Sequence, residues 1–460
     1  MKRKGIDAQR RSFIRRCLAA SVGSAAWLGF GSAMGLASAA LKQTRALPGY
    51  RALVCLYLDG GNDSYNMLVP TGTSEYSNYS AVRGNLALNL NQLLALNGTS
   101  HGLHPAMPRM AARYNQGQVA FVNNVGTLIQ PTTASQYHNG SVPLPAQLFS
   151  HSDQSKQWEL TAADSQTAKG WLGRAADLLQ SFNSSLIPMN ITLADLRTLQ
   201  VGNGGMPYAL APSGLEDFRH RWGVRGPDRH AAYMALQQLG YGHPMMQQFS
   251  QTHQDTLAIY DELSADLATV PDIPNASEYP SGERLARQLQ MVARVILSQA
   301  PKAGVNRQIF MVRMGGHDLH DNLLSGQQEL LGVIDQCVDA FFNTLASPQW
   351  GGLQDNVTLF SLSEFARTLT SNGDGSDHGW GGVQFVLGGA VQGGMYGSYP
   401  DLALNGPQNI DPDRGRLVPN LAVEQYAATL VRWMGVADAD LPLIFPNLGN
   451  FPTGNLGFMA

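Results

Sequence analysis

Runs of consecutive apolar residues mark the segments of the chain that are buried on two sides. Most positions in these runs are apolar, and they lack the strict alternation of a half-exposed strand. Strands in a parallel sheet covered by helices on both faces have this pattern. The runs therefore predict the central strands of an α/β fold with a doubly wound, mostly parallel sheet, and they cover residues 52–58, 119–125, 307–312, 357–362 and 383–387.

Apolar residues at helical spacing lie between these strands. A predicted helix over 330–345 connects the third and fourth strands as part of a β–α–β unit. Further helices are predicted over 102–118 and 423–434. From about 227 to 301 the pattern changes to long helices without apolar β runs. We expect this region to be a helical insertion that caps the carboxyl edge of the sheet.

The amino terminus has the pattern of an export signal. Seven Lys or Arg residues and one acid lie in residues 1–16, and a weakly apolar run rich in Ala, Gly and Ser follows. The sequence A-S-A at 37–39 offers a cleavage site. A membrane anchor is the alternative, because the run could just span a bilayer. The small residues and the cleavage site favour a signal peptide over 1–39, followed by one domain over 40–460.

Two adjacent arginines within this segment, Arg10 and Arg11, lie in a sequence that resembles the twin-arginine export signal. We therefore expect the twin-arginine translocase as a partner during export and a periplasmic or secreted location. Replacing both arginines by lysine should trap a precursor in the cytoplasm, which cell fractionation and immunoblotting would detect. Normal processed protein in the periplasm of that variant would contradict the prediction.

The net charge of the chain without its predicted signal peptide differs from that of proteins that bind polyanions. Removing seven of the 31 basic and one of the 34 acidic residues leaves 24 and 33, a net charge of −9. That balance argues against nucleic acid or an anionic membrane as a partner. Only Cys55 and Cys337 remain after the signal, and we interpret both as core thiols.

Acidic and histidine side chains gather at the ends of three predicted strands. The carboxyl ends of parallel strands meet at one edge of a sheet, where ligands commonly bind. Mixed carboxylate and imidazole donors favour zinc, manganese or iron over calcium. The candidate ligands of a divalent metal are Asp59 and Asp63 after the first strand, Asp318 and His320 after the third, and Glu364, Asp377 and His378 after the fourth.

Ser150 and Ser152 lie at the predicted start of a helix. A serine there usually caps the helix, but it can also be a nucleophile whose developing charge faces the helix dipole and a metal. Arg367, beyond the strand-end Glu364, or Arg313 could bind an oxyanion through two hydrogen bonds. A structural ion pair is the alternative for either arginine.

Several of these segments together resemble an exported bacterial family, the domain of unknown function 1501. The resemblance covers nearly all of the chain after the signal, and SEF…DHGWGG is its most specific part. The matching segments read LYLDGGNDSYNMLVP, GLHPAMPRMAARYNQGQVAFVNNVG, SHSDQSKQW, GWLGR, MGGHDLHDN, SLSEFARTLTSNGDGSDHGWGG and FVLGGAVQGGMYG.

That family looks like a branch of the alkaline phosphatase and sulfatase superfamily. The resemblance implies an alkaline-phosphatase-like sheet with metal pockets beside a nucleophile, for which Ser150 is the candidate and Ser152 the reserve. The family often lacks an acid at the place of Asp59, which leaves Asp63 as the alternative ligand. Ser363-Glu364-Phe365 stands where hydrolytic relatives carry Asp-His, which implies that one metal site is weakened.

Two functions are compatible with these features. The first is an exported metal-dependent hydrolase of phosphate or sulfate esters, acting on a small anionic ester or a surface polymer, with metals activating the attacking hydroxyl. The second is a non-catalytic binding or cell-surface assembly protein that retains the fold.

Overall fold

The apolar runs form the middle of a nine-stranded sheet in the computed structural model of the chain, which describes residues 49–161, 169–217 and 223–460. The predicted signal peptide lies outside the described residues. The strands lie in the order β11 (Gly394–Tyr396), β5 (Val119–Gly126), β10 (Gly382–Leu387), β9 (Val357–Leu362), β1 (Arg51–Leu58), β8 (Arg307–Met314), β6 (Asn190–Thr192) and β7 (Tyr208–Ala209), with β12 (Leu421–Ala422) beside β5.

Strand β1 lies between β8 and β9 and is parallel to both. On one side β6 and β7 continue the parallel arrangement. On the other side β10 is antiparallel to both of its neighbours, β9 and β5. Because β10 runs the opposite way, one loop connects the end of β9 to the start of β10, and this loop lies at the same edge of the sheet as the loops that follow β1 and β8.

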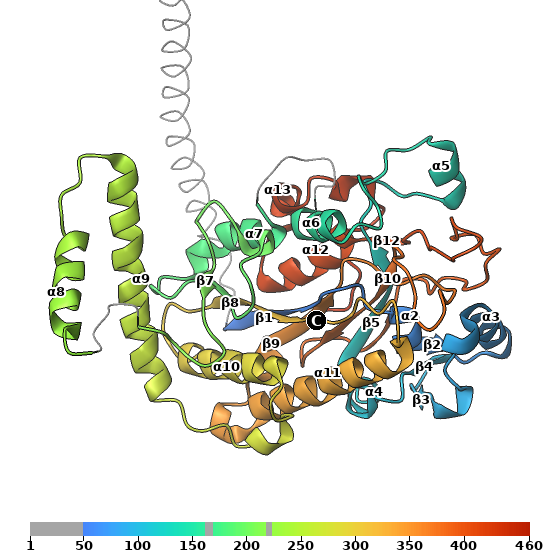
Figure 1. Cartoon of the computed structure of the whole chain (residues 1–460), viewed down its shortest axis with the longest axis horizontal. Coiled ribbons are helices and arrows are strands. Elements are labelled where there is room, and N and C mark those ends of the chain that lie inside the picture. Colours follow the sequence, from blue (N-terminus) through green and yellow to red (C-terminus); the bar gives the residue numbers. More distant parts are fainter. Residues whose placement is uncertain (1–48, 162–168, 218–222) are drawn as a thin grey trace, which may run out of the picture. The chain divides into compact units, whose positions relative to one another are not determined.

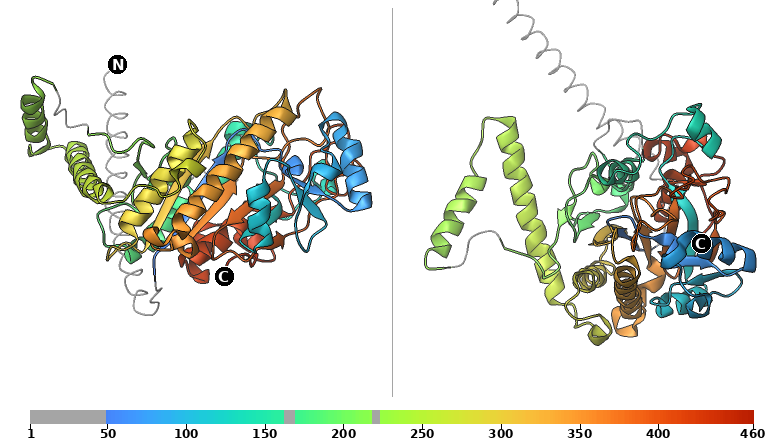
Figure 2. Two further views of the ribbon diagram at one scale, coloured as in Figure 1. Left: turned by 90° about the horizontal axis from the view of Figure 1, so that it is seen from below. Right: turned by 45° about the vertical axis from the view of Figure 1, so that its right-hand side comes forward.

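Helices cover both faces of this sheet (Figures 1 and 2). Alternate residues of β1 belong to two separate cores, because successive side chains of a strand point to opposite faces. Val54 and Leu56 pack with α4 (Pro108–Asn115), α10 (Arg284–Gln299) and α11 (Leu323–Ala346). Leu53 and Cys55 pack on the other face with α6 (His151–Leu160), α7 (Trp171–Leu179), α12 (Val423–Met434) and α13 (Leu441–Ile444). The predicted doubly wound α/β fold is confirmed.

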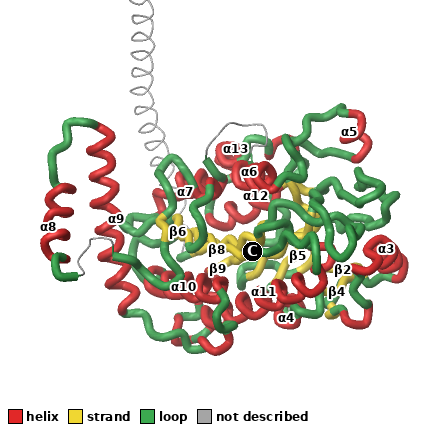
Figure 3. Tube along the Cα trace, in the orientation of Figure 1, coloured by secondary structure: helices red, strands yellow, loops and turns green. Residues whose placement is uncertain are grey.

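The remaining elements lie around this framework (Figure 3). They are α2 (Ser64–Met67), β2 (Leu68–Pro70), α3 (Thr73–Arg83), β3 (Leu94–Ala95), β4 (His101–Leu103) and α5 (Ala134–Asn139). Strands β2, β4 and β3 form a small antiparallel sheet, and α4 follows it. The region predicted as one helix over 102–118 therefore contains the end of a strand and a shorter helix. None of the helices within the described ranges is both long and apolar enough to cross a membrane.

The region from 227 to 301 contains α8 (Gly226–Gln237), α9 (Pro244–Ala268) and α10. It does not form the cap over the carboxyl edge that we expected from the sequence. Helix α10 packs on one face of the sheet because ten of its residues are buried, including Leu289 and Val292. Helices α8 and α9 form a hairpin that projects beside the β7 edge (Figures 1 and 2).

Candidate metal centre

Two loops meet at the carboxyl edge of the sheet: the loop after β8 and the loop over 363–381 that connects β9 to β10. The backbones of Arg367 and His378 pair as an antiparallel bridge, which holds the two ends of the second loop together. Gly60, after β1, lies against the first loop: its φ is +118°, and a Cβ there would lie 2.4 Å from the backbone nitrogen of Asp318. A residue with a side chain would push this loop away from β1.

Three side chains from these loops converge on one point. His320 Nε2 lies 3.0 Å from Asp318 Oδ1, and His378 Nε2 lies 3.3 Å from the same oxygen. The two imidazole Nε2 atoms are 3.1 Å apart. These three atoms form a nearly equilateral triangle, although their residues come from two separate loops.

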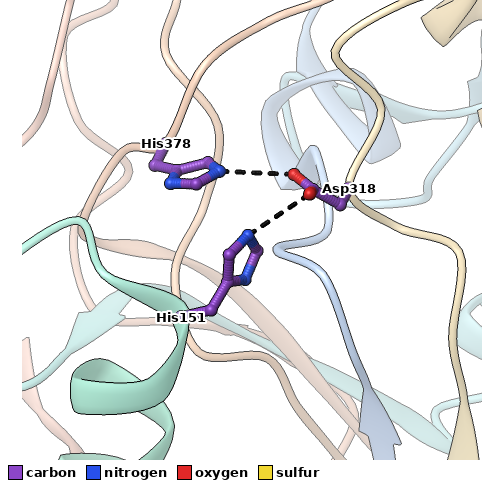
Figure 4. A group of neighbouring side chains, drawn as sticks. All are labelled: His151, Asp318 and His378. Carbon is purple, nitrogen blue, oxygen red and sulfur yellow. Dashed lines mark hydrogen bonds and ion pairs between the residues drawn. The ribbon is translucent and has the colours of Figure 1, made fainter.

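A fourth side chain reaches this point from the start of α6. The chain turns sharply at Phe149, whose φ is +71°, and the helix begins two residues later at His151. Nε2 of His151 is buried, makes no hydrogen bond, and lies 3.4 Å from Asp318 Oδ2. Figure 4 shows His151 and His378 each pointing a ring nitrogen at the carboxylate of Asp318.

Each histidine has an acceptor at its other ring nitrogen. Nδ1 of His151 lies 2.8 Å from Glu364 Oε1, and Nδ1 of His378 lies 2.8 Å from the carbonyl oxygen of Phe149. Nδ1 of His320 lies 3.3 Å from Asp377 Oδ1. An acceptor at Nδ1 favours the tautomer with its proton there, which leaves the lone pair of Nε2 free. All three lone pairs are therefore directed toward Asp318.

This donor set fits a divalent metal ion. Ligand atoms that share a tetrahedral zinc ion at ~2.0–2.1 Å lie roughly 3.3 Å apart, close to the three edges of the Asp318, His320 and His378 triangle. The ligand atoms of His151, Asp318 and His378 also lie within 4.8 Å of one another. Histidine ligands oriented by carboxylates and carbonyl oxygens are typical of metal sites in proteins.

Charges around the triangle favour an ionised Asp318. Burial alone would raise the pKa of this carboxyl, but the hydrogen bond and charge of Arg367, together with His151 and His320, lower it. The hydrogen bond with Glu364 raises the pKa of His151 despite its burial. Burial lowers the pKa of His378. The site therefore contains a carboxylate and a neutral imidazole, which is the protonation state that metal binding requires.

Arg367 takes part in the site as a support for Asp318. Its side chain is fully buried and donates to Asp318 Oδ1 over 2.7 Å and to the carbonyl oxygen of Gly60 over 3.2 Å. It also donates to the carbonyl oxygen of Ser376. Its two guanidinium NH₂ nitrogens, Nη1 and Nη2, thus have protein partners. The arginine connects all three strand-end segments and fixes the Asp318 carboxylate.

Glu364 and Asp377, predicted as ligands, contact the histidines instead. Glu364 is 1% exposed, and its Oε1 accepts from the backbone nitrogen of Gly60 over 2.9 Å in addition to His151. Asp377 contacts Nδ1 of His320 and lies 3.6 Å from Arg414. Both carboxylates orient imidazole rings from the side away from Asp318.

The structure does not bring Asp59 or Asp63 to the triangle, because arginines hold both carboxylates. Asp63 forms an ion pair with Arg83 in which both side chains are buried. Asp59 lies 3.1 Å from Arg197 and also pairs with Arg313. The first strand therefore contributes the backbone of Gly60 to the site, and its two acids belong to structural ion pairs.

The two candidate serines lie at the start of α6, next to His151. The Ser150 hydroxyl donates to Asp153 Oδ2 over 2.6 Å and lies 3.2 Å from the Ser152 hydroxyl. Ser152 is exposed and lies 3.3 Å from the same carboxylate oxygen. Neither hydroxyl makes a hydrogen bond with the triangle in the described structure. The sequence focused attention on Ser150, whereas the helix geometry directs His151 into the site.

No curated protein matches the sequence. Among solved structures, an alkaline phosphatase mutant is similar at 12% identity with a TM-score of 0.28, over 70% of this chain and 64% of that chain. A 2-O GAG sulfatase is similar at 10% identity with a TM-score of 0.26, over 75% of this chain and 66% of that chain. This chain thus covers slightly less than two thirds of the length of each protein.

A protein family matches far more of the chain. The matched residues, 50–411, extend from the start of β1 past β11 and include every side chain of the triangle. They also include His151 and Glu364. The chain belongs to the family described as "Protein of unknown function (DUF1501)".

Proposed function

We propose that the chain is an exported hydrolase of phosphate or sulfate esters that uses a divalent metal ion bound by Asp318, His320 and His378. One observation carries the proposal: three imidazole Nε2 atoms, each with its Nδ1 beside an acceptor, face one carboxylate. Three protein ligands leave a position open for substrate or water, as in catalytic zinc sites. Zinc, manganese and iron all accept this mixture of nitrogen and oxygen donors.

When bound, such an ion supplies a Lewis acid that makes a bound water more acidic and stabilises negative charge on the ester oxygens. The substrate we propose is a small anionic ester or an anionic group on a surface polymer. Arg414 supports this choice, because its half-exposed guanidinium lies 3.6 Å from Asp377 beside the triangle. An exposed arginine there can contact phosphate or sulfate oxygens through two hydrogen bonds.

His151 is the general base in this proposal. Glu364 accepts from Nδ1, so Nε2 can take the proton of a water that attacks phosphorus or sulfur. The bond between that atom and the ester oxygen breaks, and the proton then passes from His151 to the departing alkoxide. Water is preferred to Ser150 as the nucleophile because the Ser150 hydroxyl is engaged with Asp153.

A panel of phosphate and sulfate esters tests this function on metal-replete protein. We expect hydrolysis of at least one ester, and replacing His151 by alanine should lower kcat by about 10²–10⁴-fold, the usual contribution of a general base. Glu364→Gln should lower kcat in the same direction while metal content is retained. Ser150→Ala should remain active. If Ser150 were the nucleophile, this variant would be inactive.

Lys302→Ala is a suitable control, since Lys302 forms ion pairs with Glu262 and Asp266 outside the site. Its activity should equal that of the wild type. If the protein binds metal stoichiometrically but leaves every ester untouched, the non-catalytic binding or assembly function gains support and the hydrolase proposal is rejected.

A further inference from the structure

The hairpin of α8 and α9 exposes apolar side chains at its tip, which we define as residues 236–249. Leu236, Leu239, Met245, Met246 and Phe249 have exposed fractions of 43% to 76%. The hairpin projects beside β7, and its tip lies away from the sheet (Figures 1 and 2). A cluster of large exposed apolar residues commonly marks an interaction site.

Polar contacts hold the two helices of this hairpin together. The Ser250 hydroxyl and the Gln254 amide donate to the carbonyl oxygen of Gln237 over 2.5 and 2.6 Å, and the Tyr233 hydroxyl lies 2.6 Å from Nδ1 of His253. The groove between the helices, about 390 Å³, is lined mainly by glutamines. The apolar side chains at the tip are therefore not needed to join α8 to α9.

The hairpin has almost no core of its own. Within α8, Gly226 and Gln237 are the buried residues, and among the described residues of α9 before Leu257 only Ser250 is buried. An isolated helix as short as α8, with 12 residues, is marginal in water unless an apolar face packs against another element. A partner that covers the tip would supply this packing.

The absence of charge indicates which partner fits. No Lys, Arg, Asp or Glu occurs between residues 230 and 254, although 14% of the whole chain is charged. An anionic lipid surface would require basic residues, and a charged protein partner would require opposite charges. Interfaces of obligate homodimers are instead apolar and depleted in charge. Two copies of an uncharged surface meet around a two-fold axis without repulsion.

We propose that the hairpin tip is a homodimer interface, in which the tips of two copies pack as four helices around a two-fold axis. The five exposed apolar side chains would form the centre of this interface, and flanking helix surface would extend it toward the ~800 Å² per partner of a standard interface. The interface is independent of the metal centre and of the proposed hydrolase activity.

Sedimentation equilibrium and light scattering on the purified full chain at micromolar concentration test this proposal. We expect the wild type to have twice the mass of one chain. The double substitution Met245→Glu and Phe249→Glu should halve that mass, because a two-fold axis would bring four carboxylates together. Circular dichroism should confirm that the variant keeps its helices.

Leu443→Glu is the matched control, since Leu443 is 52% exposed on α13, outside the hairpin. That variant should remain a dimer. A monomeric wild type, or a dimer that survives the double substitution, would overturn the proposal. Flotation of a monomeric wild type with neutral phosphatidylcholine vesicles would assign the tip to a lipid surface instead.

Discussion

Replacing His378 by alanine is expected to remove most of the bound metal and to lower the thermal stability of the protein. The wild type should contain about one divalent ion per chain, and the variant would retain two of three ligands. Stabilisation by an ion present at 100 times its Kd amounts to about 2.7 kcal/mol, and this contribution disappears with the ion. Elemental analysis after dialysis and thermal unfolding with and without a chelator would measure both effects.

His138→Ala is the matched control, because His138 is exposed on α5 outside the triangle. It should keep its metal and its unfolding temperature. If His378→Ala retains the ion, the assigned ligands are wrong even though a metal is present. If carefully metal-replete wild type holds no ion, the metal-dependent hydrolase is rejected together with its ligands.

Replacing Arg83 in the buried Arg83–Asp63 ion pair is expected to destabilise the protein more than the loss of the bound metal ion does. Arg83→Ala should lower the free energy of unfolding by about 3–5 kcal/mol, because a buried carboxylate loses its partner. Arg83 also donates to the carbonyl oxygens of Thr368 and Leu369 over 2.9 and 3.0 Å, which would become unpaired. Urea denaturation monitored by circular dichroism would measure the change.

Lys302→Ala again provides a comparison, since its partly exposed ion pairs with Glu262 and Asp266 should contribute about 1 kcal/mol or less. Changing Arg83 to Met together with Asp63 to Leu should recover part of the loss, because no buried charge remains unpaired. A loss below that of Lys302→Ala would show that Asp63 is not held as a buried carboxylate. In that case Asp63 would return as a candidate ligand.

The central strands could be predicted because burial on both faces leaves a strong one-dimensional signal. The antiparallel direction of β10 cannot be recognised from the sequence, since a strand buried on both faces has the same composition in either direction. Helix α10 was predicted correctly as a helix, but helical periodicity cannot tell whether its apolar side faces a sheet or covers a site. The cap expected over 227–301 was wrong for this reason.

Sequence patterns identify site residues that lie at strand ends, but they do not show which of these side chains already have partners in the folded protein. Asp318, His320 and His378 were recognised because each follows or precedes a buried strand at one edge. Asp63 also lies just beyond a buried strand, and only the structure shows that its carboxylate forms an ion pair with Arg83 from α3. His151 belongs to no strand end, and its position depends on where α6 begins. The adjacent Ser-His sequence was the available signal.

The position of β1 in the sheet determines when the protein can fold during synthesis. β1 occupies residues 51–58, but both of its neighbours come from beyond residue 306. Such distant pairing slows folding, because the entropy of closing a very long loop is lost before the strand contacts form. While the ribosome completes the intervening chain, β1 is an unpaired apolar segment of the kind that aggregates or binds chaperones. The sheet edge that carries the triangle is thus assembled only after most of the polypeptide has been made.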